Sequence, residues 1–102
     1  MKKIIDGYLY DTENATKLHN YWNGLSSSDF RNYEESLYLT SNGRFFLSGE
    51  GGPMTKWAKS DGNTSTGSSG IIPLTNELAL EWAETHEMDI YITNSHFKIK
   101  EA

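Results

Sequence analysis

The stretch SLYLTSNGRFFLS, residues 36–48, gives the strongest structural signal in the chain. Hydrophobic and aromatic residues occupy its two arms, 36–40 and 44–48, and the pair Asn42-Gly43 lies between them. An Asn-Gly pair tolerates the positive φ angles that tight hairpin turns require. The stretch therefore predicts a β-hairpin.

On the N-terminal side, the pair Asp6-Gly7 lies between short apolar runs and predicts a second, smaller hairpin. Either Asp11 or Thr12 can then cap a short helix that ends at about Asn20. Tyr21-Trp22 can start another strand, because aromatic residues favour strands.

On the C-terminal side, residues 60–70 read SDGNTSTGSSG and contain only Ser, Thr, Asn, Asp and Gly. This composition predicts a flexible loop. Residues 71–74 then predict a short edge strand, since Pro73 has no amide N–H to donate. The tail, residues 89–100, suits a strand or a helical turn, and the two alternatives stay open.

The clearest helix runs from Asn76 to about His86, behind Thr75 as its N-cap. Its i, i+4 spacing predicts a buried stripe of Leu78, Ala79, Trp82 and Ala83. The opposite side carries three carboxylates, Glu77, Glu81 and Glu84. Together these elements predict one α+β domain over residues 1–102: a small antiparallel sheet built from hairpins, one main C-terminal helix and a short N-terminal helix.

Composition limits the classes of function. A net charge of −5 argues against direct nucleic-acid binding, which needs a basic surface. Cysteine is absent, and no apolar run reaches the length of about 18 residues that a membrane span needs, so a cytoplasmic location is expected. Between Lys59 and Lys98 there is no Lys or Arg, but there are six acidic residues. A partner of that segment is therefore expected to be basic.

The glycine-rich run after the hairpin, Gly49-Glu50-Gly51-Gly52-Pro53, does not fit a phosphate-binding loop. Its glutamate repels anions, and its proline lacks an amide N–H. A bend that projects Glu50 and folds Met54 and Trp57 back over the core is the better interpretation. The three histidines are far apart in sequence, so no metal site or cofactor is predicted. Glu34 and Glu35 are adjacent and point to opposite faces of a strand, so they cannot act as a catalytic pair. The sequence leaves open a glycosidase-like pair in which Glu34 or Glu50 meets another acid in space.

The same residues carry a family resemblance. Residues 34–40 (EESLYLT), 45–52 (FFLSGEGG), Trp57-Ala58, 71–74 (IIPL) and Trp82 form a pattern within residues 4–86. This pattern resembles small proteins encoded on phages, plasmids and integrative elements of Gram-positive bacteria. The resemblance implies an accessory, anti-defence role, such as inhibition of a CRISPR effector.

We therefore expect a non-enzymatic inhibitor that binds a host defence protein through an acidic and aromatic surface. The residues expected to contact that partner are Glu77, Glu81, Glu84, Tyr33 and Glu34. A homodimer is left open.

Two alternatives remain. One is a protein that sequesters a small ligand such as a nucleotide signal, in a pocket of Glu50, Gly51, Gly52, Trp57 and Ser60. The other is a hydrolase with Glu50 as general base.

Overall fold

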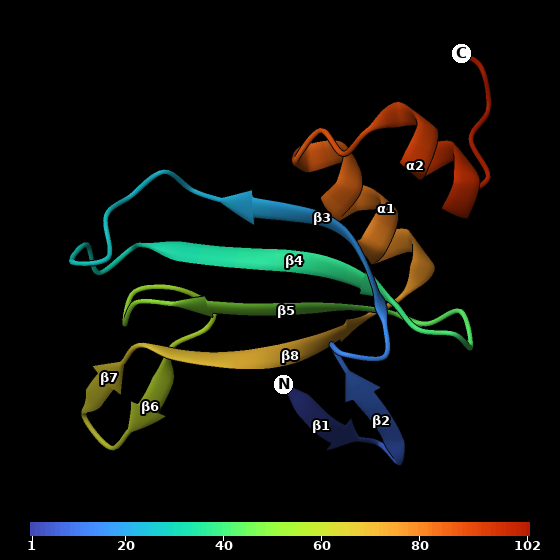
Figure 1. Ribbon diagram of the computed structural model, residues 1–102. Helices are drawn as coiled ribbons and strands as arrows, with labels where there is room; N and C mark the ends of the chain where they lie inside the picture. Colours follow the sequence, from blue (N-terminus) through green and yellow to red (C-terminus); the bar gives the residue numbers. More distant parts are fainter.

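Four antiparallel strands form the central sheet of the computed structural model, which describes residues 1–102 (Figure 1). Their order across the sheet is β3 (Thr16–Trp22), β4 (Tyr33–Leu39), β5 (Phe45–Gly51) and β8 (Ser68–Leu74). The β4–β5 hairpin confirms the first prediction, and Gly43 adopts the positive φ of 85° at its turn. Both strands extend beyond the predicted arms.

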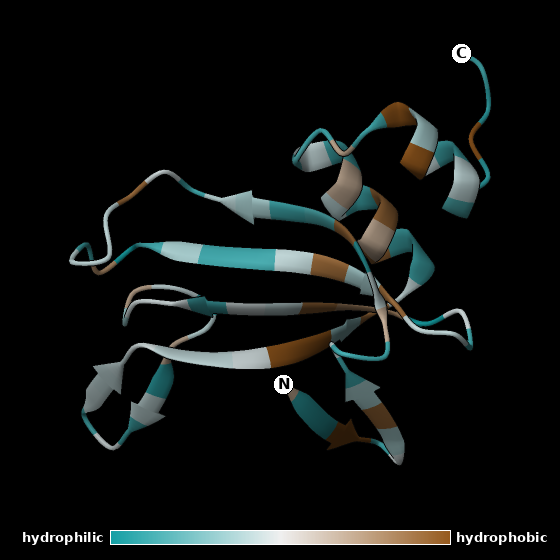
Figure 2. Cartoon of the chain, viewed as in Figure 1, coloured by the Kyte–Doolittle hydropathy of each residue, from teal (hydrophilic) through white to brown (hydrophobic).

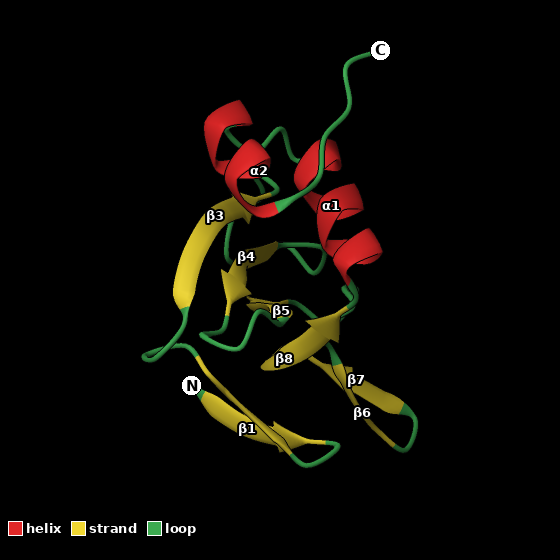
Figure 3. Ribbon diagram, turned by 90° about the vertical axis from the view of Figure 1, so that its right-hand side faces the viewer, coloured by secondary structure: helices red, strands yellow, loops and turns green.

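Two small hairpins and two helices complete the α+β fold. The hairpin of β1 (Lys2–Ile5) and β2 (Tyr8–Asp11) confirms the prediction around Asp6-Gly7. Strands β6 (Lys59–Asp61) and β7 (Thr64–Thr66) form the other hairpin. Helices α1 (Asn76–Thr85) and α2 (Ile90–His96) follow. Figure 3 shows both helices on one side of the central sheet and the β1–β2 hairpin on the other.

Three of the four central strands are apolar at one end and polar at the other. In β4, β5 and β8 the apolar ends lie side by side, since Leu37 pairs with Leu47 and Leu47 pairs with Ile72. Two residues away, Glu35 pairs with Gly49 and Gly49 with Gly70. Figure 2 shows the resulting division of the sheet into a hydrophobic half and a polar half.

The hydrophobic half carries the core. On the helix side, nine buried residues pack together: Leu18, Leu37, Phe45, Leu47, Trp57, Ala79, Trp82, Ala83 and Met88. On the other side, Tyr10 of the β1–β2 hairpin packs against Phe46 and Ile71. Tyr38 stacks on Phe46 with a ring separation of 5.1 Å. The β1–β2 hairpin is therefore held by aromatic packing.

The predicted N-terminal helix is wrong, because most of its residues belong to β3. The helix was predicted from the helical spacing of Ala15, Leu18 and His19, but the segment pairs with β4 from Thr16 to Trp22. This pairing satisfies the backbone and buries Leu18 in the core. A β-bulge between Lys17 and His19 breaks the strict alternation that would have identified the strand.

The C-terminal predictions are confirmed in part. Helix α1 has Thr75 as its N-cap, whose hydroxyl accepts a hydrogen bond from the Leu78 amide. The predicted buried position of Leu78 is wrong, because its side chain is 50% exposed. Residues 60–70 are not one open loop, since they form β6, β7 and the start of β8. The tail contains the helical alternative, α2, with Asp89 as its N-cap.

Candidate functional site

A buried carboxylate lies at the centre of the polar half. Glu35 of β4 is only 1% exposed. Its Oε1 accepts a hydrogen bond of 2.9 Å from the Trp57 indole N–H, and its Oε2 accepts one from the Trp82 indole N–H. The ammonium of Lys56 lies 2.8 Å from Oε1 and 2.9 Å from Oε2. Three donors therefore hold the carboxylate. Through them Glu35 links β4 to α1 and to the segment that carries Lys56 and Trp57.

The glycines of the polar half make room for Trp57. A Cβ atom at Gly49 would lie 2.7 Å from the Trp57 ring and 2.7 Å from the Glu35 Cβ. At Gly70 the same addition would lie 3.6 Å from the ring, an ordinary contact. The indole thus covers the face where two neighbouring strands lack side chains. Gly49 is therefore needed because any side chain at this position would collide with Trp57, which the sequence pattern alone did not reveal.

Aromatic and histidine rings surround this carboxylate. Tyr21 and His86 have ring centroids 3.9 Å apart, and Trp82 and His86 have centroids 4.7 Å apart. Partial burial lowers the pKa of His86, although the negative charge of Glu35 opposes this shift. Burial, followed by the charge of Glu35, raises the pKa of Tyr33. Both shifts favour the neutral forms of His86 and Tyr33.

The predicted ligand residues do not form one pocket. Trp57 is buried on the helix side against Glu35, whereas Glu50 is exposed. Ser60 lies on the separate β6–β7 hairpin. Only Glu50, Gly51 and Gly52 share a cleft, which has a volume of about 700 Å³.

The bend predicted at Gly49–Pro53 lies further along the chain, because Gly49 to Gly51 belong to β5. A Cβ atom at Gly52 would lie 2.6 Å from the carbonyl oxygen of Phe30, so this glycine allows two backbones to meet. Trp57 does fold back into the core, as predicted, but Met54 is 67% exposed, and that part of the prediction is wrong.

The five predicted partner residues lie on more than one surface. Glu77, Glu81 and Glu84 are exposed on α1, and none forms an ion pair, since the two ion pairs are Arg31–Asp29 and Lys56–Glu35. Tyr33 is half-buried beside Tyr21, with ring centroids 5.8 Å apart. Glu34 is exposed and accepts a hydrogen bond of 2.9 Å from Asn20. The carboxylates of α1 alone form a continuous candidate surface.

Glu34 has an acidic neighbour on the adjacent strand, an arrangement that the sequence left open. It pairs with Glu50 across β4 and β5. Side chains opposite each other on adjacent strands have Cβ atoms about 4.5–5.5 Å apart, so these two carboxylates repel each other. No group of three or more His, Cys, Asp or Glu residues is arranged to hold a metal ion.

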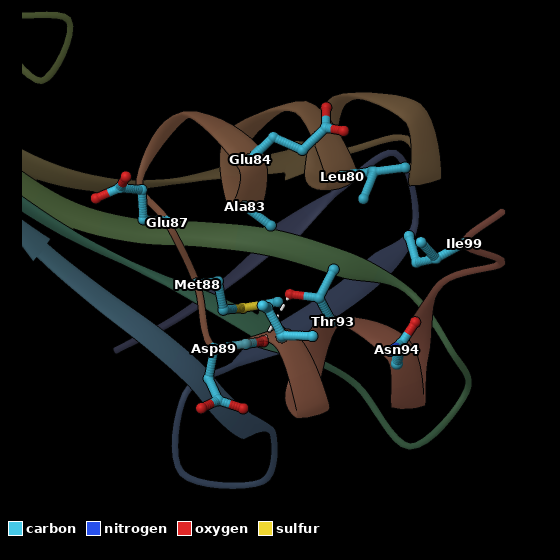
Figure 4. A pocket seen from close by; sticks show the side chains of 10 residues that line it. Leu80, Ala83, Glu84, Glu87, Met88, Asp89, Thr93, Asn94 and Ile99 are labelled. Atoms are coloured by element: carbon cyan, nitrogen blue, oxygen red, sulfur yellow. Dashed lines mark hydrogen bonds between the residues drawn. The ribbon is translucent and has the colours of Figure 1, made fainter. Parts of the chain in front are cut away.

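A further feature that the sequence did not indicate is a cleft between α1 and α2. It has a volume of about 580 Å³, and five of its ten lining residues are hydrophobic. Figure 4 shows Leu80 and Ala83 of α1 on one side and Met88, Thr93 and Asn94 on the other. The cleft was unforeseen because its second wall is α2, for which the sequence left two alternatives open.

None of the helices is both long enough and apolar enough to cross a membrane. No family model, no curated protein and no solved structure matches this chain.

Proposed function

We propose that this chain is a non-enzymatic binding protein that inhibits a host defence protein, with a CRISPR effector as the leading candidate. The observation that carries the proposal is the exposed, unpaired row of Glu77, Glu81 and Glu84 on α1. Each carboxylate is free to meet a cation of a partner.

The proposed mechanism is electrostatic competition. CRISPR effectors hold nucleic acid in positively charged channels. A compact acidic helix face can enter such a channel and occupy its Lys and Arg side chains, so the nucleic acid is excluded. Opposite charges also speed the encounter, and this effect weakens as salt screens the charges.

Capture of purified CRISPR effectors by the immobilised chain tests the proposal. We expect binding at low salt that weakens at high salt and is abolished by the charge reversal E77K/E81K/E84K. The control variant E13K/E50K/E101K changes the net charge by the same amount at exposed positions outside α1. Equal loss in both variants, or no binding to any effector, would contradict the proposal.

A second function, small-ligand binding, rests on the cleft beside Glu50, Gly51 and Gly52. No Lys or Arg lines this cleft, so a nucleotide phosphate would find no cation there. A neutral or cationic ligand would suit it better. A thermal-shift screen tests this function, because a ligand that binds only the folded state raises Tm. A hydrolase that uses Glu50 as general base would lose its activity in E50Q.

A further inference from the structure

The cleft between α1 and α2 has an apolar interior. Ala83 and Met88 are buried core residues that reach its wall, and Leu80 flanks them on α1 (Figure 4). Ile90, which also lines the cleft, is 73% exposed. An aliphatic side chain placed in the cleft would therefore cover apolar surface that is now open to water.

The rim of the cleft is acidic. Glu84, Glu87 and Asp89 all line it and are exposed. The Asp89 carboxylate also caps α2 by accepting hydrogen bonds from the Tyr91 and Ile92 amides. No Lys or Arg lines the cleft, so its rim offers three carboxylates to an occupant.

The chain's own tail places a matching pattern beside this cleft. Phe97 stacks on Phe45 of β5, with ring centroids 4.9 Å apart, and this contact holds the tail near the helices. Ile99 then lines the edge of the cleft, between Lys98 and Lys100 in the sequence (Figure 4). Ile99 remains 49% exposed, so it fills only part of the space.

We infer that this cleft binds a basic segment of the partner protein, in which an aliphatic side chain is flanked by Lys or Arg. The aliphatic side chain would lie against Ala83 and Met88, and the cations would face Glu84, Glu87 and Asp89. This inference rests on the proposed function, because it names the part of the partner that the protein recognises. It places the contact at the C-terminal end of α1 and the start of α2.

The direct test uses the full chain and a labelled peptide in which leucines alternate with arginines. We expect saturable binding by fluorescence anisotropy and NMR shift changes concentrated at Leu80, Glu84, Met88 and Thr93. Two comparison peptides replace every arginine by glutamate or every leucine by serine. Binding of either one as tight as that of the first peptide would overturn the inference, and so would shift changes confined to another surface.

Matched variants separate the two features of the cleft. N94W places a bulky ring at its mouth, whereas S95W places one on the same helix outside it. The variant E84Q/E87Q/D89N removes the rim charges and keeps a capping side chain at position 89. Its control is D6N/E13Q/D61N, which removes three exposed carboxylates outside the cleft. We expect N94W and the rim variant to weaken peptide binding at least tenfold, as for other charged and packed contacts. No change in either one would overturn the inference.

The same variants distinguish failure of this inference from failure of the proposed function. If an effector is captured and capture survives N94W and E84Q/E87Q/D89N, the cleft is not the contact, while the binding function stands. If the basic peptide binds the cleft and no defence protein is captured, the cleft assignment stands and the proposed function fails.

Discussion

The hydrophobic half and the polar half of the central sheet are both covered on the helix side, but by different kinds of contact. Across β4, β5 and β8, the hydrophobic half presents Leu37, Leu47 and Ile72 in adjacent strands. Two residues along, the polar half presents Glu35 and two glycines. Aliphatic side chains fill the first row, while an indole lies over the second and donates to the carboxylate. A polar row can thus carry part of a core when every buried polar group has a partner.

The largest expected effect comes from removal of that carboxylate. Glu35→Ala leaves two indole N–H groups and the Lys56 ammonium without their shared acceptor. We expect a loss of roughly 2–6 kcal/mol of unfolding free energy, because each of the two buried indole donors left without an acceptor costs about 1–3 kcal/mol. The Lys56 ammonium contributes less, since its side chain is 44% exposed and regains water. Urea unfolding followed by tryptophan fluorescence measures the loss.

Glu34→Ala is the matched control, one residue away on the exposed face of β4. We expect the unfolding free energy to change by less than about 0.5 kcal/mol, as for other surface sites. The lost hydrogen bond from Asn20 is offset because the repulsion between Glu34 and Glu50 is removed. A destabilisation of Glu34→Ala equal to that of Glu35→Ala would refute the assigned difference between the two carboxylates.

The hydrophobic half should respond through lost packing alone. Leu37 is fully buried among the core residues between the sheet and α1. Leu37→Ala should cost about 2–5 kcal/mol, because the cavity collapses only in part. Replacing Leu37 with Met, which conserves volume, should cost less than about 1.5 kcal/mol. Equal losses for the two variants would show that packing does not decide this position.

A smaller effect tests how closely Trp57 lies on the glycines. Gly49→Ala places a methyl group 2.7 Å from the indole, whereas Gly70→Ala places one at 3.6 Å. We expect Gly49→Ala to cost about 1–3 kcal/mol, as overpacking does. Gly70→Ala should change stability by less than about 1 kcal/mol. Thermal unfolding of both variants measures the difference, and equal Tm values would contradict the described packing.

The contrast also explains which parts of the structure the sequence could predict. The β4–β5 hairpin and α1 follow from local chemistry, the turn at Asn42-Gly43 and the cap at Thr75. Strand β3 could not be predicted in this way, because its backbone partners lie in β4.

The candidate functional residues also differ in whether local sequence could predict them. The exposure of Glu77, Glu81 and Glu84 follows from helical spacing. The role of Glu35 does not, since its partners Trp57 and Trp82 are 22 and 47 residues away in sequence. The cleft between α1 and α2 likewise depends on where the second helix packs.

The smallest expected effect concerns the rings at the edge of the polar half. The folded protein holds His86 with a pKa below its ordinary value of 6.5, because the ring is partly buried beside Tyr21 and Trp82. The unfolded chain therefore binds the proton more readily, and stability should fall as the pH drops through 6.5 toward the folded pKa.

Tm measured against pH for the native chain and for His86→Gln tests this dependence. The variant loses the stacked imidazole at every pH, which lowers its Tm by a constant amount. The native chain should lose Tm faster than the variant below pH 6.5, so the two curves converge on acidification. His96→Gln, at the exposed end of α2, should keep the native slope. Parallel curves for the native chain and His86→Gln would contradict the lowered pKa of His86 in the folded protein.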